Sequence, residues 1–237
     1  MTENKGFALN EFYSKIFKRY DLINRIFTLG MDQSWRKTTV KKCLSVENQK
    51  ILDLCCGTGD LTIELARNSQ QSVAITGYDF NSKMLEIAKL KAAKKNIENL
   101  KFMQGDAAEM PFEDESFNSI TVGFGFRNLT FDNPNKDKHI AETFRVLKKG
   151  GRFLILESAV PKNAFIRLFY KIYLYLFLIP IGGLLSGNPK AYWYLAHSSA
   201  GFYSVEEIQQ MLHEKGFTGF ESQNFFFGAA NLIIAQK

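Results

Sequence analysis

The residues best suited to ligand chemistry lie in a short turn, Gly57-Thr58-Gly59, between an apolar run over residues 51–54 and a helical pattern that begins at Asp60. Glycine lets the backbone approach a ligand closely because no Cβ intervenes, and a helix start presents unpaired N–H groups. A second apolar run, residues 73–78, ends at Asp79, 20 residues beyond Gly59. An acid that faces solvent at this strand end is placed to bind a ribose diol. The stretch therefore predicts a site for a nucleoside-like ligand.

A ligand with phosphates does not suit this turn. The third glycine of a G-x-G-x-x-G motif would fall at Thr62, and Asp60 puts a negative charge at the helix start where a pyrophosphate would bind. No Lys-Ser or Lys-Thr pair follows the glycines, as a P-loop requires. Adenosylmethionine is a nucleoside without phosphate, so it is the favoured ligand. An ordinary glycine turn in an α/β sheet is the alternative.

Two more groups of small and polar residues follow predicted strands. Gly105-Asp106-Ala107 comes after a strand over residues 100–104, and a segment from Gly123 to Arg127-Asn128 comes after a strand over residues 118–123. The carboxyl ends of parallel strands meet at one edge of a sheet, so we expect both groups to face the ligand crevice. Two glycines beside an Arg-Asn pair weaken a fold but suit a site. His139 and His213 fall in predicted peripheral helices, where a solvated or capping role is expected.

The elements that must position these residues alternate between strand and helix up to residue 157. This alternation predicts an α/β fold with a Rossmann-like, mostly parallel sheet of seven strands and an antiparallel last strand. We expect one domain over residues 1–237, made of a helical cap (1–48), a cofactor-binding core (49–158), an insertion (159–203) and a C-terminal helix with two strands (204–237). Ser34 is expected to cap the second helix of the cap, and Ser204 with Glu207 the C-terminal helix.

Composition narrows the choice of partners and compartment. The formal net charge of +6 and the isoelectric point near 9.1 favour an acidic partner such as anionic lipid or nucleic acid. Three cysteines cannot form the disulfide framework of a secreted domain, and no Cys or His spacing suggests a metal site. The polar start of the chain lacks the apolar segment of a signal peptide, so a cytoplasmic protein is expected.

The insertion over residues 159–203 is unlike the rest of the chain. It is rich in aromatic residues, and Ile172 to Leu185 carries no formal charge. These fourteen residues are interrupted by Pro180 and Gly182-Gly183, so we expect them to be too short to span a bilayer. A lid or an interfacial helix is favoured, and an ordinary buried helical pair is the alternative.

With these residues in place, the chain resembles the class I adenosylmethionine-dependent methyltransferases, and among them the ubiquinone/menaquinone biosynthesis C-methyltransferase family. The motifs that carry the resemblance are Tyr20-Asp21-x-x-Asn24 with Trp35, Gly57-Thr58-Gly59-Asp60, Phe124-Gly125-x-Arg127-Asn128, Arg145-Val146-Leu147-Lys148-x-Gly150-Gly151 and Tyr194-Leu195-Ala196-x-Ser198. The sequence departs from the family pattern at Cys55, where the first glycine of the turn is usual, and at Asp32, where a histidine is frequent.

The resemblance implies methyl transfer from S-adenosyl-L-methionine to a ring carbon of a prenylated hydroquinone. It implies that Thr58, Asp79, Asp106 and Ala107 contact the cofactor. The adjoining positions complete the predicted cofactor site, namely Asp53, Gly57, Gly59 and Gly123. Arg127 is the best partner for a ring oxyanion, because a guanidinium stays charged and directional. Asn128, Tyr20 and Asp21 are expected to orient the second oxygen or relay a proton.

Several functions stay open at this level. Demethylmenaquinol is the favoured substrate, and a methoxybenzoquinol of the ubiquinone pathway, another small molecule or RNA are alternatives. The uncharged insertion opposes RNA, since nucleic-acid surfaces interleave basic and aromatic residues. A non-catalytic scaffold that binds cofactor only for stability is the alternative of another class. A cytoplasmic location with peripheral contact to the inner face of the membrane is expected, with homodimer formation left open.

Overall fold

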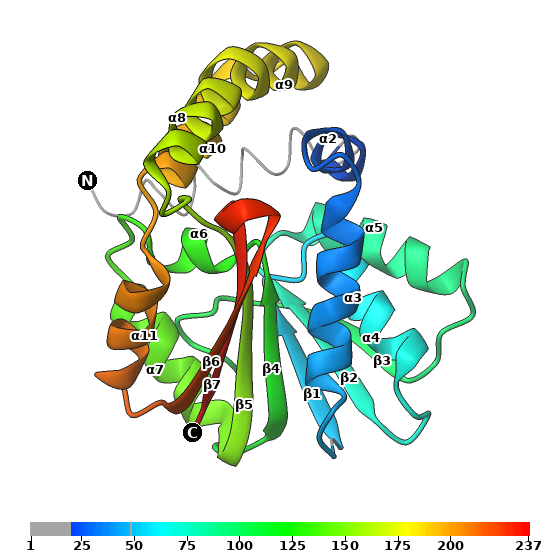
Figure 1. Cartoon of the computed structure of the whole chain (residues 1–237). Coiled ribbons are helices and arrows are strands. Elements are labelled where there is room, and N and C mark those ends of the chain that lie inside the picture. Colours follow the sequence, from blue (N-terminus) through cyan, green and yellow to red (C-terminus); the bar gives the residue numbers. More distant parts are fainter. Residues whose placement is uncertain (1–19, 48) are drawn as a thin grey trace.

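Seven strands form one sheet in the order β3-β2-β1-β4-β5-β7-β6 (Figure 1). The computed structural model describes residues 20–47 and 49–237, without the side chain of Tyr20. The strands are β1 (Lys50–Leu54), β2 (Ala74–Asp79), β3 (Leu100–Gln104), β4 (Phe117–Gly123), β5 (Leu147–Ser158), β6 (Thr218–Phe225) and β7 (Ala230–Gln236). The first five pair in parallel, and β7 runs antiparallel between β5 and β6. The predicted Rossmann-like sheet with an antiparallel last strand is confirmed.

Helices cover both faces of this sheet. On one face α3 (Met31–Cys43) and α4 (Asp60–Asn68) bury apolar side chains against Ile51 of β1. On the other face α7 (Lys136–Val146) and α11 (Val205–His213) pack against Leu52 and Leu54 of the same strand. Successive residues of a strand point to opposite faces, so an apolar run buries both sides of a central strand.

Local chemistry sets where several helices begin. Ser204 and Glu207 form the predicted capping box of α11, and the Asn81 side chain accepts the Met84 N–H at the start of α5 (Ser82–Ala93). The prediction that Ser34 caps the second helix of the cap is wrong. Gly30, in a left-handed conformation with φ 75°, ends the turn after α2 (Tyr20–Phe27), and α3 begins at Met31.

The predicted break in the insertion is also wrong. Residues Ala164–Ser186 form one helical rod of 23 residues, made of α8 (Ala164–Tyr173), a π-helical turn η1 (Leu174–Leu178) and α9 (Ile179–Ser186). Proline lacks an N–H and collides with the carbonyl four residues earlier in a regular helix. The wider π turn directly before Pro180 changes that hydrogen-bond register and accommodates the ring.

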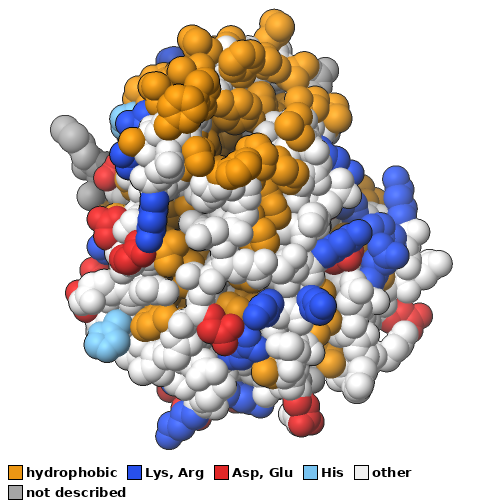
Figure 2. All heavy atoms as spheres, viewed as in Figure 1, with side chains coloured by type: hydrophobic (Ala, Val, Ile, Leu, Met, Phe, Trp, Pro, Cys, Tyr) orange, Lys and Arg blue, Asp and Glu red, His pale blue; other side chains and the backbone are white. Residues whose placement is uncertain are grey.

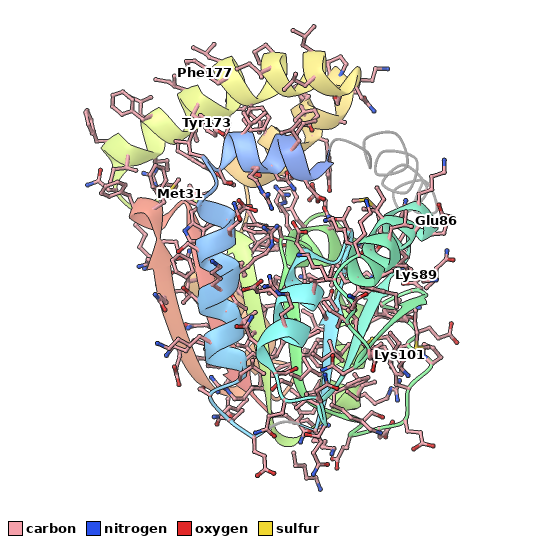
Figure 3. The ribbon with its side chains drawn as sticks, turned by 90° about the vertical axis from the view of Figure 1, so that its right-hand side faces the viewer. Met31, Glu86, Lys89, Lys101, Tyr173 and Phe177 are labelled. Atoms are coloured by element: carbon pink, nitrogen blue, oxygen red, sulfur yellow. The ribbon has the colours of Figure 1, made fainter. Side chains whose placement is uncertain are left out.

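The two glycines of α9 serve packing and do not end the helix. A Cβ on Gly182 would lie 2.3 Å from the ring of Tyr192 in α10 (Pro189–Ala200), and one on Gly183 would lie 3.0 Å from Pro189. Glycine at these positions lets α9 and α10 approach closely. Together α8, α9 and α10 stand above the carboxyl edge of the parallel strands, and α2 packs beneath the helical rod (Figures 1 and 3).

Candidate active site

The predicted cofactor turn and Asp79 form one hydrogen-bonded unit. Asp79 Oδ2 accepts the Gly57 N–H at 2.8 Å, and Oδ1 accepts the Asn81 N–H at 2.9 Å. The carboxyl is 6% exposed, and burial raises its pKa to about 6 against the opposing effect of these backbone donors. The expectation that Asp79 faces solvent is therefore wrong, because its carboxylate also holds the turn in shape.

The turn has the backbone conformation that glycine favours. Gly57 and Gly59 have φ values of 52° and 80°, and Cys55, at the usual position of a glycine, also adopts a left-handed φ of 54°. A Cβ on Gly59 would lie 2.9 Å from Ala88 Cβ, so this glycine brings α4 and α5 together. The cysteine therefore carries the local strain that a glycine would avoid.

Asp53 lies in β1 beneath the turn. Its two oxygens accept hydrogen bonds from the hydroxyls of Thr62 (2.6 Å) and Thr121 (2.8 Å). Burial raises the pKa of Asp53 to about 6, and both hydroxyls oppose the rise. Asp53 thus joins α4 and β4 to β1, and it also lines a small cavity with Gly57, Thr58 and Gly123.

Helix α2 is bound to the cofactor turn by charged contacts. Thr58 Oγ1 donates to Asp21 at 2.6 Å, and Lys91 Nζ of α5 donates to Asp21 Oδ2 at 2.5 Å and to Asp60 Oδ1 at 2.6 Å. The cavity left at the turn measures about 30 Å³, far below the several hundred Å³ that are typical of a ligand pocket. The carboxylates, hydroxyl and backbone donors of the turn suit a nucleoside cofactor, and Asp21 of α2 accepts the hydrogen bond of one of these donors, the Thr58 hydroxyl.

The loop after β3 holds the remaining predicted cofactor residues. A Cβ on Gly105 would lie 1.9 Å from Tyr78 Oη, whose hydroxyl donates to the Asp106 carbonyl at 3.1 Å. The Asp106 side chain is exposed, Ala107 is buried, and Asp106 Oδ1 lies 3.8 Å from His139 Nε2. His139 is not solvated, since the imidazole is 6% exposed, but its Nδ1 bonds the Leu129 carbonyl at 2.8 Å in the last turn of the short helix after β4, which agrees with the capping role.

Arg127 is the second residue of the short helix α6 (Phe126–Thr130) after β4 and is 4% exposed. Its Nη1 donates to the Ser199 hydroxyl and, at 3.3 Å, to the Leu195 carbonyl. Its Nε is buried and has no hydrogen-bond partner among the residues that the structure describes. A buried charged donor without an acceptor is costly, so this atom suits an anionic ligand oxygen.

A second cavity of about 530 Å³ lies beside Arg127. Most of its walls are apolar or aromatic side chains. They come from α2, α3, α8, η1, α10, the turn η2 (Phe226–Gly228) and the segment after β4, and include Phe27, Trp35, Phe124, Phe165, Phe169, Tyr170, Tyr173, Leu178, Tyr192, Phe226 and Phe227. The hollow opens among the apolar side chains over these helices (Figure 2). Its volume and apolar lining suit a molecule of drug size.

Three charged side chains line this cavity in the described part of the chain, namely Asp32, Arg36 and Arg127. Of the described residues, Arg36 alone also lines the small cavity at the cofactor turn. It pairs with Asp32 and stands over the ring of Phe124 at 5.4 Å. Arg36 therefore marks the junction between the two cavities.

The structure places the residues predicted for catalysis at different sites. Arg127 lines the large cavity, whereas Asp21 binds the cofactor turn and neither Asp21 nor Asn128 is among the cavity's lining residues. The side chain of Tyr20 lies outside the described residues, so the roles of all four stay predictions. Sequence reasoning missed Lys91 as a site residue. Its position on the same helical face as the buried Met84 and Ala88 was the available signal.

Comparison with known proteins gives the relatives of the chain. The model of the ubiE/COQ5 methyltransferase family matches residues 1–237. A demethylmenaquinone methyltransferase of Thermotoga maritima is 41% identical over 224 residues, 94% of this chain and 93% of its own. One from Deinococcus radiodurans is 37% identical over 235 residues, 99% and 95% of the two chains.

Solved structures share the fold at much lower identity. A SAM-dependent methyltransferase from Aquifex aeolicus superposes with a TM-score of 0.63 at 16% identity, covering 91% of this chain and 96% of its own. With the family model spanning the whole sequence, the chain belongs to the ubiE/COQ5 methyltransferase family and is a methyltransferase with S-adenosyl-L-methionine as its cofactor.

Proposed function

We propose that this enzyme methylates a ring carbon of a prenylated hydroquinone, with demethylmenaquinol as the preferred substrate. The observation that carries the proposal is the buried, unpartnered Nε of Arg127 at an apolar cavity of about 530 Å³ that meets the cofactor turn at Arg36. A flat, apolar ring with an ionisable hydroxyl matches both the lining and the single open donor. The relatives from Thermotoga maritima and Deinococcus radiodurans are demethylmenaquinone methyltransferases by name, which agrees with this substrate.

The chain's own residues contribute positioning and charge. The bound cofactor supplies an electrophilic methyl group. Arg127 would hold one ring oxygen as its anion, because a buried guanidinium favours the charged form of an acceptor and raises electron density on the ring. The aromatic walls would exclude water and keep the ring in line with the cofactor, which accounts for much of the rate in such reactions.

The choice between quinone classes is tested by substrate competition. Methyl transfer from labelled cofactor is measured with reduced demethylmenaquinone and with a methoxybenzoquinol of the same tail length. We expect the naphthoquinol to have the higher kcat/KM. Equal or reversed values would favour the ubiquinone-pathway substrate, and no transfer to either, with cofactor still bound, would favour the scaffold function.

We further propose that the enzyme works at a membrane surface. Exposed apolar side chains gather on the helical rod and at the large cavity, and we name them the apolar crown. Leu29, Phe165, Phe169, Phe226 and Phe227 line the cavity, and Leu168, Leu176, Phe177 and Leu184 are exposed on the rod. A continuous apolar area covers the top of the molecule, where α8, α9 and α10 lie (Figures 1 and 2). Patches of this kind on a soluble fold are typical of membrane or partner contact.

A peripheral contact fits the helical rod better than a transmembrane one. By length and composition Ala164–Ser186 could cross a bilayer. One side of it, however, packs through Leu174 and Leu178 onto Ile23 of α2 and Tyr192 of α10. Phe177 points outward from the rod while Tyr173 points toward α2 (Figure 3). We therefore propose that the rod lies on the inner face of the membrane and that the prenyl tail leaves the cavity through the apolar crown.

Basic side chains support the same orientation. Arg167, Lys171 and Lys190 flank the apolar run of the rod. A cation near an anionic membrane surface contributes about 1 kcal/mol to binding. The three together would hold the crown against acidic lipids, which agrees with the net charge of +6.

A further inference from the structure

The large cavity contains a carboxylate for which the proposed function has given no role. Asp32, in the first turn of α3, is the single carboxylate among the described residues that line this cavity, and it is 2% exposed. Its Oδ1 accepts the Thr28 hydroxyl at 2.8 Å, and its Oδ2 accepts from Arg36. Each carboxylate oxygen has a further lone pair, so both retain the capacity to accept a proton.

The position of Asp32 relative to the two cavities is what matters for chemistry. Asp32 lies one helical turn before Arg36, and these two residues are paired. Arg36 lines both the cofactor turn and the large cavity. A ring carbon that receives a methyl group must lie at this junction, so Asp32 stands beside the carbon that has to lose its proton.

We propose that Asp32 is the proton acceptor of the methyl transfer, an inference that rests on the proposed function. The ring carbon forms a bond to the methyl carbon, and the methyl–sulfur bond breaks with its electron pair left on sulfur. The proton on the same ring carbon then passes to a carboxylate oxygen of Asp32. The electron pair of that C–H bond restores the aromatic ring and returns the negative charge to the oxygen held by Arg127. Asp32 later releases its proton to solvent.

The other titratable and charged groups around the cavity do not compete for this role. Arg36 from α3 and Arg127 from α6 carry guanidinium groups, which donate hydrogen bonds and have no lone pair that could accept a proton. Tyr170 and Tyr173 of α8 and Tyr192 of α10 also line the cavity. Burial raises the pKa of Tyr170 to about 12 and raises that of Tyr173 as well, so both keep their protons at neutral pH.

Asp32→Asn and Asp32→His test the proposal with reduced demethylmenaquinone. The asparagine variant keeps the shape of the side chain but loses its basicity, so kcat should fall roughly a hundredfold or more. The histidine variant restores a base, and the acidic limb of its kcat profile should move up toward the ordinary imidazole pKa of about 6.5. With substrate deuterated at the reacting carbon, the isotope effect on kcat should grow in Asp32→Asn, because proton removal becomes slower.

Folding and cofactor binding are monitored in parallel, by thermal midpoint and by calorimetric titration of the cofactor. Asp137→Asn, an exposed acid of α7 paired with Lys215, is the matched control and should keep wild-type rates. Wild-type kcat in Asp32→Asn would overturn the proposal. An unshifted pH profile of kcat in Asp32→His would also overturn it. If the asparagine variant fails to fold, the histidine variant alone tests the proposal. A wild-type enzyme that transfers no methyl group would instead count against the proposed function.

Discussion

Asp79 joins a ligand site to the backbone that shapes it, so its removal should have two effects. In Asp79→Ala the ribose loses charge-assisted hydrogen bonds worth roughly 1.5–3 kcal/mol each. The amides of Gly57 and Asn81 also lose their acceptor, and we expect the free energy of unfolding to fall by about 1–3 kcal/mol. Calorimetric titration and urea denaturation measure the two effects. Unchanged cofactor affinity would remove Asp79 from the ribose site.

Replacing Arg127 should lower the turnover rate and leave the affinity for the cofactor unchanged. Arg127→Lys keeps the positive charge but loses the planar fork and its Nε, so single-turnover methyl transfer should slow about a hundredfold or more while cofactor affinity is retained. Arg67→Lys, at a half-exposed position of α4, serves as the control. If Arg127→Lys transfers methyl groups at the wild-type rate, Arg127 is a structural anchor for Ser199 and the Leu195 carbonyl.

In helix α9 a glycine-to-alanine change should raise helix propensity but worsen packing, so it tests which effect is larger. Alanine is favoured over glycine in a helix interior by about 1 kcal/mol. The new Cβ in Gly182→Ala would nevertheless lie 2.3 Å from the Tyr192 ring, so we expect the thermal midpoint to fall. Adding Tyr192→Ala restores the space, and the double variant should lose less stability than the sum of the two single ones. If the stability losses of the two single variants simply add in the double variant, α9 and α10 do not contact each other through Gly182.

The same elements explain what sequence could and could not predict. The sheet was predictable because buried parallel strands leave apolar runs bounded by turn residues, as in residues 51–54. Pro180 and Gly182 were misinterpreted as helix breakers, because the π turn and the Tyr192 contact that accommodate them are tertiary features. The cofactor turn was recognisable from local spacing. The i,i+4 spacing of Asp32 and Arg36 permits their pairing within a helix. Their position at the junction of two cavities depends on how α3 packs, which no local pattern records.

At the scale of the whole molecule, the apolar crown should separate membrane binding from folding. Phe177 is 51% exposed, so Phe177→Asp should leave the thermal midpoint nearly unchanged. It should weaken binding to acidic liposomes and lower turnover more on long-tailed quinols than on short ones. Leu90→Asp, 63% exposed on α5 away from the crown, is the matched control and should bind liposomes normally. A collapsed midpoint with equal loss on both substrates would make the rod part of the core.

Helix α2 touches both ligand sites, and this gives the enzyme an expected order of events. Asp21 at one end bonds Thr58 of the cofactor turn, and the Phe27 carbonyl at the other accepts the Tyr173 hydroxyl at 2.6 Å. We expect a quinol that fixes Tyr173 to hold α2 against the cofactor turn and so to slow the exchange of the cofactor. Binding would then be ordered: the cofactor binds before the quinol, and the demethylated cofactor leaves after the methylated product. Thermodynamics requires each ligand to change the other's affinity by the same factor. Titrating S-adenosylhomocysteine with and without a bound quinone analogue measures that factor, and a value of one would mean that α2 keeps the two sites independent.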